Sequence, residues 1–288
     1  MSRVLTPAQA AESSIQKQFR KYIWAPFLEA VRQYELIENG DRIAVCISGG
    51  KDSFLMAKLF QLHRKMSGIE YEPVYLCMDP GYTEETKQLV LDNASRLEIP
   101  IQMFRSDIFD IIGTAGNKRC FLCSRMRRGC LYGKAQELSC NKIALGHHLN
   151  DAVETVLMSM FYSSKLETMI PKCISENHEG MSLIRPMYRI KEEAVNDWCS
   201  LNDLSFIRCA CPVTAEKDGS ARTRVKELVS ELKKENPEIE DNIFRALHAV
   251  QLDSFPGYKT KGTLHSFTEE YNRADLSCTD CARTDNRE

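Results

Sequence analysis

The sequence lacks the features of a membrane-spanning protein and of an elongated repeat protein. None of its apolar runs approaches the roughly 18 residues of a membrane-spanning helix. The first twenty residues lack the apolar core of a secretory signal, so we expect a cytoplasmic protein without a membrane partner. Internal repeats and low-complexity blocks are missing too. With 38 Lys and Arg against 40 Asp and Glu, the net charge of −2 neither favours nor excludes a nucleic-acid partner.

The twelve cysteines do not have the setting of a disulfide framework. The chain has 288 residues and no export signal, whereas disulfide scaffolds are short secreted domains. In a reducing compartment, clustered cysteines more often bind metal or take part in chemistry. The length predicts about two domains, or one large domain with extensions.

Two common nucleotide fingerprints are absent. No Gly-x-Gly-x-x-Gly is present, and Gly50-Lys51 is followed by aspartate, which breaks the Walker pattern. What is present is an apolar strand, Ile43–Ile47, followed by Ser-Gly-Gly-Lys-Asp-Ser at 48–53 and a helical pattern. Glycines and free N–H groups at a helix start form a cradle for phosphate. A simple glycine turn, capped by Asp52 or Ser53, is the competing interpretation.

Alternating patterns predict an α/β fold with a doubly wound parallel sheet. Further strands are expected at Pro73–Met78, Ile101–Phe104 and Lys142–Gly146, with helices between them. Ligands of such sheets bind beyond the carboxyl ends of the strands. We therefore expect residues 48–53, Met78–Gly81 and Gly146–Asp151 to meet at one edge.

The domain organisation follows from the same patterns. We predict a helical N-terminal extension over 1–40, the nucleotide-binding domain over 41–215 and a C-terminal helical segment over 216–256. Residues 257–288 are polar and poorly periodic, so we expect a flexible tail. Inside the domain, Ser164–Leu183 is broken by proline and glycine and is predicted to be a mobile loop.

The cysteines form one tight pair and one later cluster. Cys120 and Cys123 open a predicted helix within a basic stretch, where thiolate is favoured. Cys209 and Cys211 precede a proline far along the chain. Two plus one thiols suit an iron–sulfur cluster with one open iron, whereas structural zinc takes four ligands. A thioredoxin-like redox pair is the alternative for the first two.

Together these motifs resemble a known family. Residues 48–53 match the PP-loop signature of the ATP pyrophosphatases. Cys120-x-x-Cys123 with its arginines, Leu145-Gly-His-His-x-x-Asp151, Met160-Phe-Tyr, Arg185-Pro-Met and the late cysteine follow in the order of the tRNA 2-thiocytidine synthetase (TtcA) family. The resemblance spans about residues 20–255. It implies tRNA thiolation with ATP, Mg²⁺ and a 4Fe-4S cluster.

The resemblance also implies roles for individual residues. Asp52, as the magnesium ligand, Asp151 and Arg127 would be catalytic. Cys120, Cys123 and Cys211 would hold the cluster, with Cys209 as the alternative third ligand. Arg125 and Arg128 would bind tRNA. The ATP-binding residues would be Ser48, Gly49, Gly50, Lys51, Asp52, Ser53, Met78, Gly146 and His147.

Several points stay open at the level of sequence. A cysteine desulfurase or free sulfide would supply the sulfur, and a homodimer is one option for the assembly. A PP-loop ligase that uses an amine nucleophile is the competing enzyme, although it leaves the three cysteines without a role. A metal- or redox-sensing protein with a non-catalytic nucleotide site is the competing binding protein. Cys278 and Cys281 cannot close a tetrahedral metal site by themselves.

Overall fold

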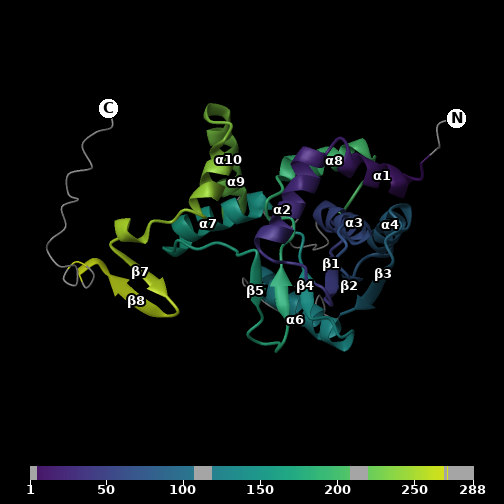
Figure 1. Ribbon diagram of the computed structural model, residues 1–288, viewed down its shortest axis with the longest axis horizontal. Coiled ribbons are helices and arrows are strands. Elements are labelled where there is room, and N and C mark those ends of the chain that lie inside the picture. The colour runs from purple at the N-terminus through teal and green to yellow at the C-terminus, as the bar shows by residue number, and fades with distance from the viewer. Residues whose placement is uncertain (1–4, 107–118, 208–219, 269–270, 272–288) are drawn as a thin grey trace. The chain divides into compact units, whose positions relative to one another are not determined.

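The computed structural model describes residues 5–106, 119–207, 220–268 and 271, with the backbone alone for 119–125. The chain divides into two compact units, Met1–Glu240 and Asp241–Glu288. The α-helices (Figure 1) are α1 Pro7–Gln16, α2 Ala25–Gln33, α3 Lys51–Met66, α4 Glu84–Arg96, α6 Arg119–Glu137, α7 Leu149–Ser163, α8 Glu192–Leu201, α9 Ala221–Glu235 and α10 Ile239–Ala246. The strands are β1 Arg42–Ile47, β2 Glu72–Asp79, β3 Ile101–Arg105, β4 Lys142–Ala144, β5 Lys172–Ile174, β6 Ser182–Ile184, β7 Gly257–Thr260 and β8 Thr263–Ser266. None of the described helices is both long and apolar enough to cross a membrane.

A six-stranded sheet forms the centre of the first unit, in the order β3-β2-β1-β4-β6-β5. In the middle of β1, Ala44 pairs with Val74 of β2 on one side and with Ile143 of β4 on the other. All pairings are parallel except that of β5 with β6 at the edge. The order reverses direction between β1 and β4, and such a switch point opens a crevice beyond the strand ends.

Each face of the sheet carries its own layer of helices (Figure 1). Alternation along β1 sends Ile43, Val45 and Ile47 into a core shared with α3 and α4. Ala44 and Cys46 point to the opposite face and pack in a core with α6. A strand buried on both faces reads as one continuous apolar run, which is why the sequence predicted β1 correctly.

The N-terminal helices pack on the sheet domain through a buried lysine. Lys58 of α3 is 1% exposed. Its Nζ donates to Glu12 Oε1 of α1 at 2.8 Å, to Gln61 Oε1 at 2.7 Å and to the carbonyl of Leu97 at 3.1 Å. The ammonium is thus fully hydrogen-bonded, as a buried charge requires. The predicted helical character of the first forty residues is confirmed by α1, the π-helical turn Arg20–Trp24 and α2.

The prediction of a mobile loop over Ser164–Leu183 is wrong. This stretch contains β5 and most of β6, which complete the sheet. Leu183 and Ile184 are 2% and 0% exposed, because β6 pairs in parallel with buried β4. Pro171 stands just before β5, at the edge of the sheet, where its missing N–H costs no ladder hydrogen bond. Proline at 171 and glycine at 180 flank these short strands, which is why the sequence suggested a loop.

The expectation of a tail without structure from residue 257 is also wrong for its first ten residues. β7 and β8 form an antiparallel hairpin in the second unit. Lys261 and Gly262 both have positive φ, 48° and 85°, as a two-residue hairpin turn requires. The rings of Tyr258 and His265 stack across it at 4.7 Å. Most of 267–288 lies outside the described residues, and the boundaries at 41, 216 and 257 stay predictions.

Candidate functional site

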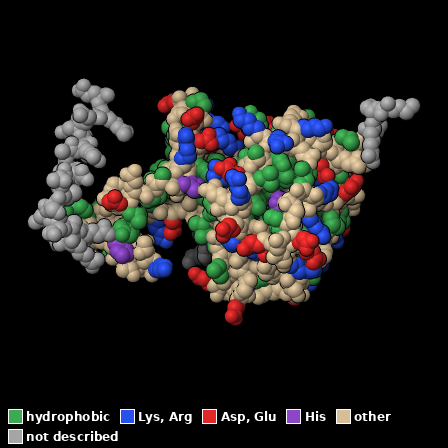
Figure 2. All heavy atoms as spheres, viewed as in Figure 1, with side chains coloured by type: hydrophobic (Ala, Val, Ile, Leu, Met, Phe, Trp, Pro, Cys, Tyr) green, Lys and Arg blue, Asp and Glu red, His purple; other side chains and the backbone are tan. Residues whose placement is uncertain are grey.

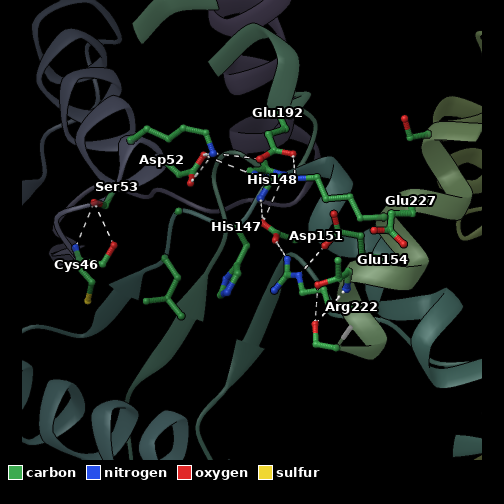
Figure 3. A pocket seen from close by; sticks show the side chains of 18 of the residues that line it. Cys46, Asp52, Ser53, His147, His148, Asp151, Glu154, Glu192, Arg222 and Glu227 are labelled. Atoms are coloured by element: carbon green, nitrogen blue, oxygen red, sulfur yellow. Dashed lines mark hydrogen bonds and ion pairs between the residues drawn. The ribbon is translucent and has the colours of Figure 1, made fainter. Parts of the chain in front are cut away.

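A cavity of about 790 Å³ lies at the carboxyl ends of β1 and β4. Figure 3 shows its side chains, which come from α3, α7, α8 and α9 as well as from the strand ends. The lining brings together these residues that the sequence assigned to the site: Ser48, Lys51, Asp52, Ser53, Gly146, His147 and Asp151. It also contains residues that the sequence did not assign, among them Glu154, Glu192, Arg222, Lys226 and Glu227.

The loop after β1 adopts a conformation that favours glycine at one position. Gly49 has a φ of +83°, and a Cβ there would lie 2.4 Å from Ile207 Cδ1. Gly50 is the N-cap of α3 and has no side chain with which to cap it. The first N–H groups of α3, which have no partner within the helix, therefore remain available to an anion at the cavity.

Two hydroxyl groups hold this loop. The Ser53 hydroxyl accepts from the backbone N–H of Ser48 at 3.2 Å and donates to the carbonyl of Gly50 at 2.7 Å. From the loop after β2, the Tyr82 hydroxyl donates to the carbonyl of Ser48 at 3.1 Å. Asp79 fixes that second loop by accepting from the N–H of Tyr82 at 2.7 Å. The loop is therefore preorganised by its own hydrogen bonds.

Gly146 lets the end of β4 approach the start of α3. A Cβ at this position would lie 3.2 Å from the backbone carbon and oxygen of Asp52 and 3.3 Å from the backbone nitrogen of Ser53. Backbone atoms cannot rotate away as a side chain can, so any larger residue would push the two segments apart. This close approach joins two sequence motifs that are about a hundred residues apart into one site.

Lys51 is held at the cavity by two carboxylates. Its Nζ lies 3.1 Å from Glu192 Oε1 and 3.5 Å from the Asp52 carboxylate. The other oxygen of Glu192 accepts from Lys226 Nζ of α9 at 2.6 Å. Burial opposes the charge of Glu192, but the two lysines outweigh it and lower the pKa of Glu192 from its ordinary value of 4.5 to about 2. Glu192 thus stays ionised between two cations.

This pairing predicts a pH-dependent loss of stability. The pKa of Glu192 is lower in the folded chain than in the unfolded one. Its ionised carboxylate therefore contributes to the free energy of unfolding above about pH 4.5, and this contribution is lost as the pH falls towards 2. We expect Glu192→Gln to destabilise the protein by about 1–3 kcal/mol at pH 7, and by less at pH 3. Urea titrations at both pH values measure this difference. Glu193→Gln is the matched control, because the Glu193 side chain is 69% exposed. If Glu192→Gln lowers the free energy of unfolding equally at both pH values, the lowered pKa of Glu192 is wrong.

Asp52 has a carboxylate oxygen that suits a metal ion. Asp52 Oδ1 is buried and has no hydrogen-bond partner, although Lys51 Nζ lies 3.5 Å and His148 Nε2 3.8 Å away from it. Within the described residues, no three His, Cys, Asp or Glu side chains group closely enough to hold a metal by themselves. Mg²⁺ commonly binds one or two carboxylates together with substrate phosphates and waters. The donor set therefore fits a Mg²⁺ ion that arrives with a nucleotide.

The two histidines after β4 differ in surroundings. Burial lowers the pKa of His147 to about 4, so this ring is neutral at physiological pH. His147 Nδ1 is buried and has no hydrogen-bond partner in the described chain. The ring of His148 lies between two carboxylates, 3.8 Å from Asp52 and 3.5 Å from Asp151 Oδ2. His148 therefore links the phosphate loop to the start of α7.

Asp151 caps α7 and pairs with α9. Its Oδ2 accepts from the backbone N–H of His148, the N-cap residue, at 2.9 Å. Its Oδ1 accepts from Arg222 Nη2, and Arg222 Nε donates to Glu154 Oε2 at 2.6 Å. Burial raises the pKa of Asp151, but His148 and Arg222 outweigh it, so the pKa lies below its usual value. A negative charge is therefore fixed beside the loop at neutral pH.

Some assigned residues do not line this cavity. Met78, the last residue but one of β2, packs against Phe104, Met126 and Leu131, and Leu131 also lines the cavity. Arg127 is half-buried and Arg128 is exposed, both on α6. The roles of these three in ATP binding, catalysis and tRNA binding stay predictions.

The proposed cluster ligands cannot be compared with the cavity. Cys120 and Cys123 are in the first turns of α6, whose predicted start and end are confirmed. Their side chains and that of Arg125 lie outside the description, as do Cys209 and Cys211. The described cysteines are free thiols, mostly buried. Burial raises the pKa of Cys46, Cys77 and Cys199 to about 12, as expected of inert thiols in a core.

Several charged residues of the cavity were missed by sequence reasoning. Glu154 follows Asp151 by three positions, so helical spacing could have placed both on one side of α7. Glu192 and Arg222 had no such signal, since each reaches the cavity from a helix far along the chain.

The fold and the loop define a class of protein. A mostly parallel sheet with a switch point between β1 and β4, and Ser-Gly-Gly-Lys-Asp-Ser where β1 meets α3, are the features of a PP-loop nucleotide-binding domain. The comparisons with known proteins agree, since the family model described as a PP-loop domain matches residues 12–229.

Individual relatives make the class more specific. The "tRNA-cytidine(32) 2-sulfurtransferase" of Geobacter sulfurreducens is 37% identical over 225 residues, which are 77% of this chain and 87% of the relative. The protein of the same name from Syntrophotalea carbinolica is 38% identical over 226 residues, 77% of this chain and 86% of the relative. The chain belongs to the PP-loop family and, within it, to the family of these sulfurtransferases.

A solved structure shares the fold. The U34-tRNA thiolase NcsA from Methanococcus maripaludis, solved with its 4Fe-4S cluster, aligns with a TM-score of 0.62 at 20% identity. The alignment covers 84% of this chain and 83% of that one. At 20% identity this similarity shows the fold alone, and it confirms the predicted fold class.

Proposed function

We propose that the protein is an ATP-dependent tRNA sulfurtransferase that replaces the 2-oxygen of a cytidine, at position 32 as in the names of its relatives, by sulfur. One observation carries the proposal: the start of α3, Lys51 and the unbonded oxygen of Asp52 converge in one cavity with Gly146 and His147. This arrangement suits a nucleotide with its metal ion. The sulfurtransferase family to which the chain belongs supplies the choice of substrate.

The first step of the proposed reaction activates the base. The cytidine O2 attacks the α-phosphorus of ATP, and the bond from that phosphorus to the bridging oxygen breaks, so that pyrophosphate leaves. The N–H groups at the start of α3 and Lys51 stabilise the departing pyrophosphate. Asp52 holds Mg²⁺, which neutralises charge on the phosphates. To do so, Lys51 leaves its ion pair with Glu192 and contacts the phosphates.

The second step replaces the activated oxygen. A sulfur nucleophile attacks C2 of the base, and the oxygen leaves with AMP. When bound, a 4Fe-4S cluster with one iron free of cysteine would hold and deliver that sulfur. Cys120, Cys123 and Cys211, or Cys209 in its place, are the residues proposed to hold it. Free sulfide supplies the sulfur directly, whereas the persulfide of a cysteine desulfurase must also be reduced by two electrons, with a pair of thiols as the reductant. The homodimer and the cytoplasmic location remain part of the proposal.

Binding of tRNA would depend on local basic groups and not on the overall charge. Figure 2 shows Lys and Arg side chains interspersed with Asp and Glu over the face in view, as the net charge of −2 implies. Arg125 and Arg128 of α6 are proposed to contact tRNA phosphates. Such contacts are weakened by added salt, because binding releases counterions.

Mass spectrometry of tRNA nucleosides tests the proposal. We expect 2-thiocytidine to disappear from the tRNA of a strain that lacks this protein and to return with the intact gene. In a purified reaction, each thiolated base should be matched by one AMP and one pyrophosphate. Unchanged 2-thiocytidine in the deletion strain would refute the proposed substrate, and release of ADP in place of AMP would refute the proposed chemistry.

A further inference from the structure

Arg222 joins the C-terminal helix α9 to the centre of the cavity. It is the second residue of α9, and Ser220 caps this helix by accepting from the N–H of Thr223 at 3.2 Å. The guanidinium spans two carboxylates of α7, with Nε on Glu154 at 2.6 Å and Nη2 on Asp151 (Figure 3). The arginine side chain is 54% exposed, so it can reorient towards the open space of the cavity.

The two carboxylates are not equivalent partners. Asp151 has a second donor, the backbone N–H of His148, and so remains hydrogen-bonded if Arg222 leaves it. Glu154 is 5% exposed and carries a buried charge, for which loss of the arginine would be costly. A guanidinium can keep one acceptor while it exchanges another, because its donors point in several directions. The contact with Asp151 is therefore the one that can be exchanged.

A short chain of contacts connects Arg222 with the phosphate loop. The ring of His148 lies 3.5 Å from Asp151 on one side and 3.8 Å from Asp52 on the other. Arg222 and the loop residues Ser48, Lys51 and Asp52 line the same cavity. A nucleotide bound at the start of α3 would thus place its phosphates between the loop and Arg222.

The charges of the cavity favour a change of partner by Arg222 when a polyphosphate enters. The acidic residues of the lining are Asp52, Asp151, Glu154, Glu192 and Glu227, and the basic ones are Lys51, Arg222 and Lys226. Acidic groups outnumber basic ones before the nucleotide enters. A polyphosphate in such a site needs every available cation, and each one is already paired with a carboxylate.

We propose that Arg222 is a phosphate ligand in the ATP-bound protein and that Glu154 positions it. In the nucleotide-free chain the guanidinium bridges Glu154 and Asp151. When ATP enters, Nε stays on Glu154 while Nη2 exchanges Asp151 for a phosphate oxygen. This inference rests on the ATP-binding part of the proposed function. Through Arg222, α9 would contact the bound nucleotide directly.

Calorimetric titration of the full-length protein with MgATP, without tRNA, tests the proposal. We expect Arg222→Gln to weaken MgATP binding by about 10- to 100-fold, the loss of one charge-assisted hydrogen bond. Arg222→Lys should recover only part of this loss, because an ammonium cannot bridge two acceptors in the same way. Arg224→Gln is the matched control, since Arg224 is exposed on the same helix and does not line the cavity. It should change the affinity by less than about twofold.

A double-mutant cycle tests the role of Glu154. Glu154→Gln should weaken MgATP binding by about 3- to 10-fold in the wild-type background and by less than about twofold in the Arg222→Gln background. Equal losses in both backgrounds would overturn the positioning role. Wild-type affinity in Arg222→Gln would overturn the phosphate contact. If an Arg222 variant does not fold, Glu154→Gln alone decides, because unchanged affinity there refutes the proposal.

The same variants keep this inference separate from the proposed function. Wild-type protein that binds MgATP through Arg222 but yields no thiolated tRNA would refute the sulfurtransferase activity and leave the inference standing. Normal thiolation, with an unchanged KM for ATP in Arg222→Gln, would refute the inference and leave the activity standing. The expected result is an increased KM for ATP in tRNA-dependent AMP release.

Discussion

Asp52→Asn should lower tRNA-dependent release of AMP and pyrophosphate by at least about 100-fold. The carboxylate lies in the first turn of α3, and its Oδ1 is buried without a hydrogen-bond partner. An amide of the same shape keeps the packing but removes the negative charge that binds a metal ion. Radiolabelled ATP with purified tRNA measures both products. Asp52→Ala should give at least the same loss.

The control for this prediction is an aspartate away from the cavity. Asp203→Asn changes the charge equally, but the Asp203 side chain is 98% exposed. It should leave AMP release within about twofold of the wild type, as is usual for exposed positions. The melting temperature of each variant shows whether the fold is kept. If Asp52→Asn folds and still releases AMP at the wild-type rate, its role as magnesium ligand is misassigned.

The sheet could be predicted from sequence where its strands are buried on both faces. β1 and β2 are long enough, and apolar enough, to stand out between polar turns. β5 and β6 could not be found, since Pro171 and Gly180 interrupt this stretch and β5 lies at the edge, where Ile174 is 80% exposed. The hairpin β7–β8 was missed because its turn, Lys261-Gly262, is less typical than Asn-Gly.

The site could be predicted as far as local motifs reach. Residues 48–53 and Gly146–Asp151 carry their chemistry in adjacent positions, and the parallel sheet brings both to one edge. The ion pairs of Glu192 and Arg222 depend on the packing of α8 and α9 against that edge, which no local pattern specifies. The lining carries five acidic residues against three basic ones, so the sequence motifs, taken alone, overstate how positive this cavity is.

Cys120→Ala should abolish both the bound iron and the thiolation of tRNA, while the affinity for MgATP stays within about twofold of the wild type. A cluster that needs three cysteines is not retained by two thiolates, and without it no sulfur is held for the second step. Cys130→Ala is the matched control, since Cys130 lies on the same helix and packs near Met78. Anaerobic purification, with iron and acid-labile sulfide determined per chain, provides the measurement. A brown, iron-rich Cys120→Ala protein would contradict the cluster assignment.

The third ligand is decided by the same measurement on the late cysteines. Cys211 stands directly before a proline and Cys209 two residues earlier in the sequence. We expect Cys211→Ala to lose the iron as Cys120→Ala does, and Cys209→Ala to keep it. The opposite pattern would exchange the two assignments. Full iron in both single variants and in the double variant would leave Cys120 and Cys123 with no partner from this segment, and the proposed delivery of sulfur from a three-cysteine cluster would then be wrong.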